Sequence, residues 1–386
     1  MDIKEVITQA DGRAFIEFPV SLYRNAAHWI RPLDKDVNTV FDPVANPTYE
    51  FGKCVRYLLY DDSKVIGRIA VFINERTAHK NDQPTGGIGF FDCINSQEAA
   101  NILFDRAKSW LMERGMEAMD GPINFGERDK WWGCLVDGFD IDPNYQCNYN
   151  FPYYQDLFEK YGFQVYFKQF TFIRNTFEPF HPRIQEKSNI LHADPNYSFE
   201  YMRLKQLMKY AEDFRIIYNK AWTNHEGVAE MTKEQSKSIM TQMRPILDEK
   251  IIWFAYYKNE PVAFYVNLPE VNQLFKFVNG KLDMIGKLKF LWHRWRRTNK
   301  KMLGLVFGVV PEHQGKGLDG ALVMAVAKMV QQDYKRYPIL EMNWIGDFNR
   351  RMITVVKQVG GEIGKTHHTY RYLFDRSKPF ERMPIK

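Results

Sequence analysis

The chain has 386 residues, of which 45% are hydrophobic and 26% charged, a composition that excludes an intrinsically disordered protein. Its length favours two domains, or one elaborated domain, over a single small core. The net charge of +6 allows contact with phosphate-bearing ligands but is too dilute to indicate nucleic-acid binding.

The cysteines and the N-terminus point to a cytoplasmic protein. Cys54, Cys93, Cys134 and Cys147 form no CxxC pair and have no histidine at metal-ligand spacing, so we expect reduced thiols and no metal site. The first residues lack the apolar run of a signal peptide. No stretch reaches the roughly 18 uncharged apolar residues that a membrane-spanning helix requires.

The first half of the chain alternates strand and helix patterns. Strands are expected over 54–60, 65–74, 86–94, 116–123 and 164–173, the first two joined as a hairpin by the polar turn 61–64. Ser96 offers an N-cap for a long helix that ends at Gly115, and a short helix is expected over 153–161.

The second half repeats this order of elements. Helices are expected over 204–222, 233–247, 320–334 and 349–359, and strands over 251–257, 261–268, 302–310, 339–344 and 369–374. The proline-rich, polar segment 176–197 is the expected linker. The pattern predicts a duplicated α/β domain, with one copy at 1–175 and the other at 198–386.

A glycine-rich loop follows the strand that ends at Val310 and precedes a helix rich in Ala, Val and Met. Gly315, Gly317 and Gly320 let the backbone approach a ligand, and the helix N-terminus favours a phosphate group. These glycines also match the dinucleotide pattern GxGxxG. However, four residues separate the strand from the first glycine and the motif falls late in its domain, which argues against a dinucleotide fold.

The same segment resembles the acyl-CoA loop of the GCN5-related N-acetyltransferase (GNAT) superfamily. In that family a strand ending in V-x-P-x-x is followed by Gln or Arg, two residues, Gly, one residue, and Gly or Ala; residues 309–317 fit this pattern. The strand at 341–344 with the following Asn349, and the ending Gly360-Gly361 with Tyr370-Arg371-Tyr372, resemble the family's later elements. The resemblance covers about 201–375.

The resemblance implies two tandem acyl-CoA N-acyltransferase (GNAT-like) domains, each a mixed, mostly antiparallel sheet flanked by helices. It also implies that the strands 302–310 and 339–344 part to admit the pantetheine arm of acetyl-CoA or another acyl-CoA. The amide at Val309–Val310 would polarise the thioester carbonyl. The cofactor-binding residues that the resemblance implies are Val309, Val310, Gln314, Gly315, Lys316, Gly317, Gly320, Ala321 and Asn349.

The candidate catalytic residues each have a structural alternative. Glu341 would act as a base through a water molecule, or be a paired strand carboxylate. Asn349 matches a family position near the cofactor, or is a helix N-cap. Tyr372 would protonate the leaving thiolate, or is a packing residue. His367 and His368 are expected in a solvated turn.

The first half carries no glycine loop after its strand 86–94, so we expect it not to bind CoA. Fragments at 121–124, 133–139 and 149–154 resemble bacterial tandem GNAT-like proteins whose first domain is degenerate. The polar and aromatic side chains at 148–154 would line an acceptor pocket between the domains, or tie down their own loop.

The second domain contains an insertion, 270–301, with a strongly basic part. Residues 274–301 hold nine Lys or Arg against one acid, Asp283, and Leu288, Leu291, Trp292 and Trp295 fall at helical spacing. This predicts a basic amphipathic helix. Capping of the domain is the favoured interpretation, and contact with a membrane surface is the alternative.

The leading functional hypothesis is an acyl-CoA-dependent N-acyltransferase, with acetyl-CoA as the expected donor and an unidentified small-molecule amine as acceptor. A non-catalytic acyl-CoA-binding protein is the alternative, because the strand 302–310 lacks a carboxylate and Asp319 stands where the family prefers Gly or Ala. A carboxylate facing the pyrophosphate would repel it. An aminoacyl- or lipid-directed transferase on the same fold is suggested by the duplication and the insertion.

Overall fold

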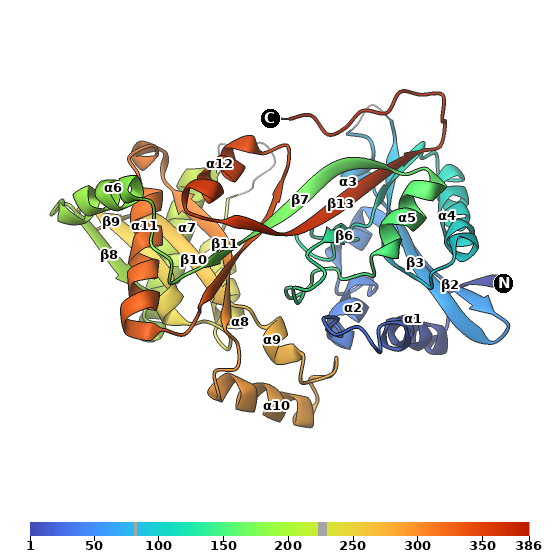
Figure 1. Cartoon of the computed structure of the whole chain (residues 1–386), viewed down its shortest axis with the longest axis horizontal. Helices are drawn as coiled ribbons and strands as arrows, with labels where there is room; N and C mark the ends of the chain where they lie inside the picture. Colours follow the sequence, from blue (N-terminus) through green and yellow to red (C-terminus); the bar gives the residue numbers. More distant parts are fainter. Residues whose placement is uncertain (81–82, 223–229, 386) are drawn as a thin grey trace.

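The computed structural model describes residues 1–80, 83–222 and 230–385 (Figure 1). The strands are β1 (Asp2–Glu5), β2 (Gly52–Asp61), β3 (Lys64–Asn74), β4 (Thr85–Cys93), β5 (Ala118–Gly121), β6 (Cys134–Asp137), β7 (Gln164–Asn175), β8 (Tyr197–Tyr201), β9 (Ile252–Tyr257), β10 (Glu260–Pro269), β11 (Lys301–Val309), β12 (Ile339–Gly346) and β13 (Glu362–Leu373). The helices are α1 (Gln9–Leu22), α2 (Asp34–Val40), α3 (Glu75–Ala78), α4 (Gln97–Met112), α5 (Tyr153–Tyr161), α6 (Pro182–Ala193), α7 (Leu207–Trp222), α8 (Lys233–Met243), α9 (Asn272–Phe275), α10 (Met284–Trp295), α11 (Leu318–Lys328) and α12 (Arg350–Gln358).

All the strands belong to one continuous sheet that runs through both halves of the molecule. Its order is β1-β2-β3-β4-β5-β13-β7-β12-β11-β10-β9-β8, with β6 paired to β13. The pairs β4–β5 and β11–β12 are parallel, and the other described pairs are antiparallel. The predicted mixed, mostly antiparallel sheet is therefore confirmed.

The two long strands β7 and β13 cross the centre of the molecule and exchange partners between the halves (Figure 1). The C-terminal strand β13 pairs with β5 of the first half, and β7, from the first half, pairs with β12 of the second. The expected domains 1–175 and 198–386 are thus joined by strand pairing as well as by the chain. The intervening segment 176–197 contains α6, which packs against α11.

The central strands of the first half are apolar along their length because both faces of the sheet are covered there. Along β3, Ile69, Val71 and Ile73 face a core shared with α4 and α5, whereas Ala70 and Phe72 face a core under α1 and α2. Successive side chains of a strand point to opposite faces, so a strand covered on both faces needs an unbroken apolar run.

Several expected elements are confirmed with shifted ends. The hairpin β2–β3 and α4 form as predicted, and the Ser96 hydroxyl caps α4 by accepting a hydrogen bond from the Ala99 amide at 3.2 Å. The helix expected over 320–334 begins at Leu318 and continues as a π-helical segment, Met329–Tyr334.

The expectation for His367 and His368 was wrong. Both lie in β13 rather than in a turn, at 1% and 8% exposure. The strand extends further towards the N-terminus than 369–374, because its first part pairs with β7, a strand from the other half. Such a distant partner leaves no local pattern in the sequence.

Candidate functional site

The strands β11 and β12 run together for only four residue pairs and then part. Their parallel register joins Lys301–Gly304 to Ile339–Met342. Beyond Gly304, β11 stays paired with β10, while β12 stays paired with β7, its partner from Ile339 to Gly346. The amide edge of β11 that faced β12 is therefore left without a strand partner in this part of the described sheet.

The glycine loop lies at the open end of this parting. Gly315 and Gly317 adopt φ angles of +74° and +84°, which favour glycine, and Gly317 is the residue before α11. A Cβ on Gly315 would meet no heavy atom within 4 Å, so its backbone is open to a ligand. His313 holds the loop to the sheet, since its Nδ1 lies 2.6 Å from the Tyr197 hydroxyl.

The charges around the loop suit an anion. Lys316 and Asp319 are both exposed, so the Asp319 carboxylate is in solvent rather than packed against the loop. Lys187 of α6 adds a second positive charge beside the loop, which the sequence alone did not indicate. Its Cβ lies 3.9 Å from the position that a Cβ on Gly317 would occupy. Lys187 is exposed and reaches the loop because α6 packs antiparallel to α11, with Ile184 next to Gly320.

The strand end before the loop offers one amide, not two. The Val310 amide donates to the Val262 carbonyl at 3.0 Å, so it is not free to polarise a thioester. Because successive residues of a strand turn their amides to opposite sides, the Val309 amide faces the side that β12 has left. The Gln314 side chain donates to the Val309 carbonyl at 3.1 Å and fixes this strand end. Ala321 is fully buried in the core below.

A tyrosine hydroxyl lies where the strands part. A Cβ on Gly304 would meet the Tyr265 Oη at 3.4 Å and the Asn267 Oδ1 at 3.5 Å. Burial raises the pKa of Tyr265, so its hydroxyl carries a proton at neutral pH. No sequence pattern pointed to Tyr265, because β10 has the apolar sequence of an ordinary core strand.

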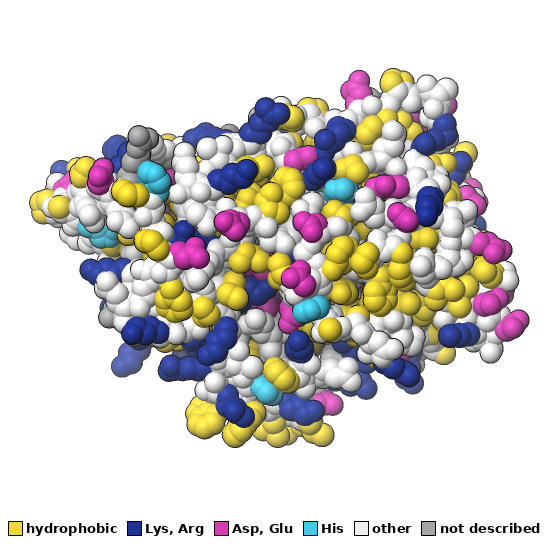
Figure 2. Space-filling view, viewed as in Figure 1, with side chains coloured by type: hydrophobic (Ala, Val, Ile, Leu, Met, Phe, Trp, Pro, Cys, Tyr) yellow, Lys and Arg dark blue, Asp and Glu magenta, His cyan; other side chains and the backbone are white. Residues whose placement is uncertain are grey.

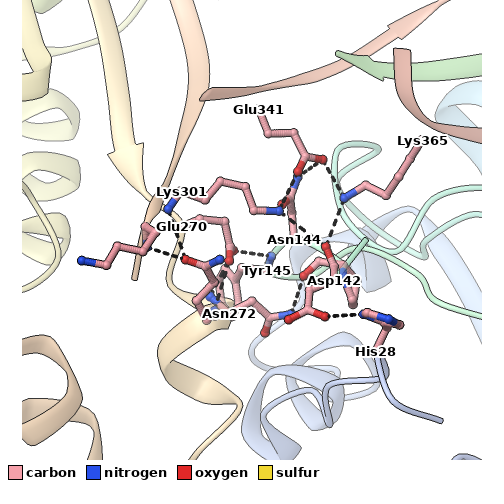
Figure 3. A network of polar contacts seen from close by, with 12 residues as sticks. His28, Asp142, Asn144, Tyr145, Glu270, Asn272, Lys301, Glu341 and Lys365 are labelled. Carbon is pink, nitrogen blue, oxygen red and sulfur yellow. Dashed lines mark hydrogen bonds and ion pairs between the residues drawn. The ribbon is translucent and has the colours of Figure 1, made fainter. Parts of the chain in front are cut away.

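Glu341 lies at the closed end of the parting, inside a buried polar network that links the two halves (Figure 3). Its carboxylate is 0% exposed and lies 2.6 Å from the Nζ of both Lys301 and Lys365. The Asn144 side chain, from a first-half loop, donates to Glu341 Oε1 at 2.7 Å and accepts from Lys301 at 2.8 Å.

These partners determine the charge of Glu341. Burial alone would raise its pKa, but the adjacent Lys365 and Lys301 hold the pKa of Glu341 at about 2. A neighbouring carboxylate, Glu270, is buried and accepts backbone hydrogen bonds from Tyr145, Asn272 and Gln273. Burial raises the pKa of Glu270. The network therefore holds an ionised Glu341 whose oxygens are already occupied.

The other two candidate catalytic residues lie elsewhere. Asn349 is exposed and caps α12, with its side chain accepting from the Met352 amide at 3.1 Å. Tyr372 packs in the first-half core against Tyr161 and Phe163, opposite Met119 of β5. The strand exchange carries it away from the glycine loop, so the structure does not bring Tyr372 together with Glu341.

In the first half, the end of β4 corresponds to the end of β11 in the second half. Side chains of the first half itself occupy this position. The backbone of Cys93, at the end of β4, accepts a hydrogen bond from Tyr153 at 2.7 Å and donates to Tyr154 at 3.1 Å. Asn150 bonds the backbone of Leu135 through both side-chain atoms, and Asn148 donates to Gly133. These bonds fasten the segment 148–154 to β4, β6 and Gly133, and Asn148, Asn150 and Tyr154 also line a pocket. That pocket lies within the first half rather than between the two halves.

Two curated relatives match the chain over nearly its whole length. It is 26% identical over 383 residues to the bacterial ceramide synthase of Caulobacter vibrioides (strain NA1000 / CB15N), covering 96% of this chain and 97% of the relative. It is 24% identical over 374 residues to protein YghO of Escherichia coli (strain K12), covering 95% and 94%. No family model matches the chain.

Among solved structures, a tandem GNAT protein from the clavulanic acid biosynthesis pathway superimposes on 98% of this chain and 100% of its own, with a TM-score of 0.53 and 10% identity. The chain has the tandem GNAT fold. The GCN5-related glucosamine N-acetyltransferase region of a fungal multi-domain β-N-acetylglucosaminidase also matches, with a TM-score of 0.53 and 11% identity, over 96% of this chain and 38% of that one.

The tandem GNAT fold confirms the fold class and the duplication expected from the order of elements. In residues 1–80, 83–222 and 230–385, no group of three or more His, Cys, Asp or Glu side chains is arranged to hold a metal ion. None of the helices in these ranges combines the length and apolarity needed to cross a bilayer.

Proposed function

We propose that the protein is an acyl-CoA-dependent N-acyltransferase whose donor site lies in the second GNAT-like domain. The observation that carries this proposal is the open loop at Gly315 and Gly317, at the open end of the space between the parted strands β11 and β12. Backbone amides at a helix N-terminus suit a pyrophosphate, and a strand edge without a partner suits the amides of a pantetheine arm.

The loop residues have distinct proposed roles. The amides of 314–317 would hold the pyrophosphate, with Lys316 and Lys187 adding positive charge. The exposed position of Asp319 supports this site, because its carboxylate lies in solvent and salt screens it. The Val309 amide would hydrogen-bond a carbonyl of the pantetheine arm as the arm passes along β11 towards Tyr265. Gly320 and Ala321 allow α11 to start close to α6 and the sheet.

We assign proton donation to Tyr265 rather than to Tyr372. As the amine nitrogen bonds to the acyl carbon and the carbon–sulfur bond breaks, Tyr265 would give its proton to the leaving sulfur. The resulting phenolate would then take the proton that the new amide nitrogen loses. Glu341 would position the strands, since a carboxylate held ionised by two lysines is a poor proton acceptor.

For the acceptor we propose a long-chain amine of the sphingoid type, with a fatty acyl-CoA as donor. Ceramides are amides of a fatty acid with such an amine, and the Caulobacter relative named for their synthesis matches this chain almost end to end. Amide formation from a thioester and an amine is also the reaction for which the proposed donor site is suited.

A panel assay tests both parts of the proposal. The purified chain is incubated with acetyl-CoA or palmitoyl-CoA and with sphinganine, glucosamine or lysine, while released thiol is measured and the amide is identified by mass spectrometry. We expect thiol release to require an amine, and to be fastest with palmitoyl-CoA and sphinganine. Calorimetry on the same sample measures CoA binding.

The outcomes separate the alternatives. CoA binding without thiol release for any amine would favour a non-catalytic acyl-CoA-binding protein. An absence of CoA binding would favour a transferase that uses an aminoacyl or other donor. Turnover of a water-soluble amine alone would retain the enzyme class and refute the lipid acceptor.

A further inference from the structure

The helix α10 carries an exposed apolar face on the outside of the second half. Six of its side chains are between 53% and 77% exposed. They are Met284, Ile285, Leu288, Leu291, Trp292 and Trp295, which we call the α10 face. Apolar surface of this kind is unusual on a protein that meets only water, and two neighbouring exposed tryptophans are a large part of it.

The opposite side of α10 attaches it to the protein. Phe290 stacks on Phe275 with ring centroids 5.3 Å apart, and the His293 ring lies 3.6 Å from that of Phe277. At 3.6 residues per turn, the α10 face spans an arc of about 120° that is centred opposite Phe290. The helix is therefore fixed in orientation, with its apolar side directed away from the core, and it projects from the body of the molecule (Figure 1).

Basic side chains border the α10 face. Lys287 lies along one margin of the arc, and Lys289 and Arg296 lie along the other; all three are exposed. Figure 2 shows the apolar tip at the lower edge of the molecule with Lys and Arg side chains on both sides of it. Asp283, the one acidic residue of the segment 274–301, is used to cap α10, accepting from the Gly286 amide at 2.8 Å.

We propose that the α10 face docks the protein onto a lipid bilayer that contains anionic lipids. A helix of 12 residues is about 18 Å long and cannot cross a hydrocarbon core of about 30 Å, but it can lie in the interface. Tryptophans favour the headgroup region, and flanking lysines and arginines pair with anionic headgroups. Each feature of α10 thus has a place in this arrangement.

A second copy of the chain fits this surface less well. Two such faces brought together would place their basic margins side by side, where they repel. A bilayer with anionic lipids removes this objection, because it offers negative charge at its surface and an apolar interior beneath it.

Vesicle flotation without any CoA or amine tests the proposal independently of the enzymatic function. We expect the protein to float with vesicles of phosphatidylcholine and phosphatidylglycerol at 3:1, and to bind pure phosphatidylcholine at least tenfold more weakly. The triple variant Leu288→Ser/Trp292→Ser/Trp295→Ser should lose at least tenfold in partitioning to the anionic vesicles. The variant Lys287→Glu/Lys289→Glu should bind the anionic vesicles more weakly than the unsubstituted protein. Raising the salt concentration should weaken the binding of the unsubstituted protein in the same way.

The control variant is Ile7→Ser/Val44→Ser, which removes apolar side chains of 80% and 96% exposure in the first half. It should bind as the unsubstituted protein does, and circular dichroism should show that all variants fold. Light scattering without vesicles should give the same monomer mass for each. The proposal is overturned if the protein fails to float, if the triple variant still floats, or if a dimer forms that the triple variant dissociates.

Discussion

Lys301, the first residue of β11, and Glu341 of β12 form a buried ion pair, with Nζ 2.6 Å from Oε2. The pair thus ties the two strands together within the short stretch over which they are bonded to each other. Lys365 of β13 completes the cluster from the other side. We interpret Glu341 as a positioning residue of the donor site, and this has consequences for stability.

Replacing Glu341 by glutamine should destabilise the fold strongly. The change removes the carboxylate that the buried ammonium groups of Lys301 and Lys365 both contact, and breaking a buried ion pair typically costs about 3–5 kcal/mol. Urea unfolding measures the loss. The exposed Glu362→Gln on β13 is the matched control and should change stability by less than about 0.5 kcal/mol. A Glu341→Gln protein of unchanged stability that had lost its turnover would instead support Glu341 as a catalytic base.

The protein should lose stability in acid in two stages. Burial, with Lys365 adding repulsion, lowers the pKa of His367 to about 3, so the unfolded chain takes up this proton first as pH falls below about 6.5. The pKa of Glu341 is held at about 2, so its stabilising contribution is present above about pH 4.5 and is lost as pH falls towards 2. Both protonations therefore lower the free energy of unfolding as the pH falls.

Unfolding free energies from pH 7 to pH 4 isolate the histidine. The variant His367→Phe should have a slope shallower by up to one proton, about 1.4 kcal/mol per pH unit, in that window. Trp132→Phe is the control. It alters the contact between the Trp132 and His367 rings, whose centroids are 4.6 Å apart, without removing a titrating group, and it should keep the original slope. Equal slopes for the unsubstituted protein and His367→Phe would show that His367 is accessible to protons in the folded state.

The sequence predicted local features of the site and missed those that depend on strand pairing. The glycine loop, the Ser96 cap and α10 were found because each is encoded within about 20 consecutive residues. The partners of Glu341 lie on two other strands, 40 and 24 positions away. Tyr372 looked like a site residue because the last strand was assigned to the second half, whereas β13 carries it into the first-half core.

Alanine at Gly315 should weaken acyl-CoA binding. The residue has φ +74°, where an alanine costs about 1–2 kcal/mol, so the loop would relax away from the conformation that presents its amides. We expect calorimetry to give a dissociation constant about tenfold higher. Gly115 is a close control, because it has φ +77° and, like Gly315, open space around its Cβ position. Gly115→Ala should carry the same backbone strain and bind acyl-CoA normally; equal weakening by both would point to general destabilisation.

Phenylalanine at Tyr265 should slow turnover with little change in KM. Removing a general acid typically lowers kcat by about 10²-fold or more, and the aromatic ring that packs against Phe307 is retained. Tyr210→Phe is the control, since it also deletes a buried hydroxyl, one that bonds Glu200 at 3.1 Å away from the parting strands. It should leave kcat within about twofold. A purely structural role for Tyr265 is excluded by varying the donor: a thioester of a more acidic thiol needs less protonation as it leaves. The deficit of Tyr265→Phe should therefore shrink with that donor, and a constant deficit across donors would remove Tyr265 from the chemistry.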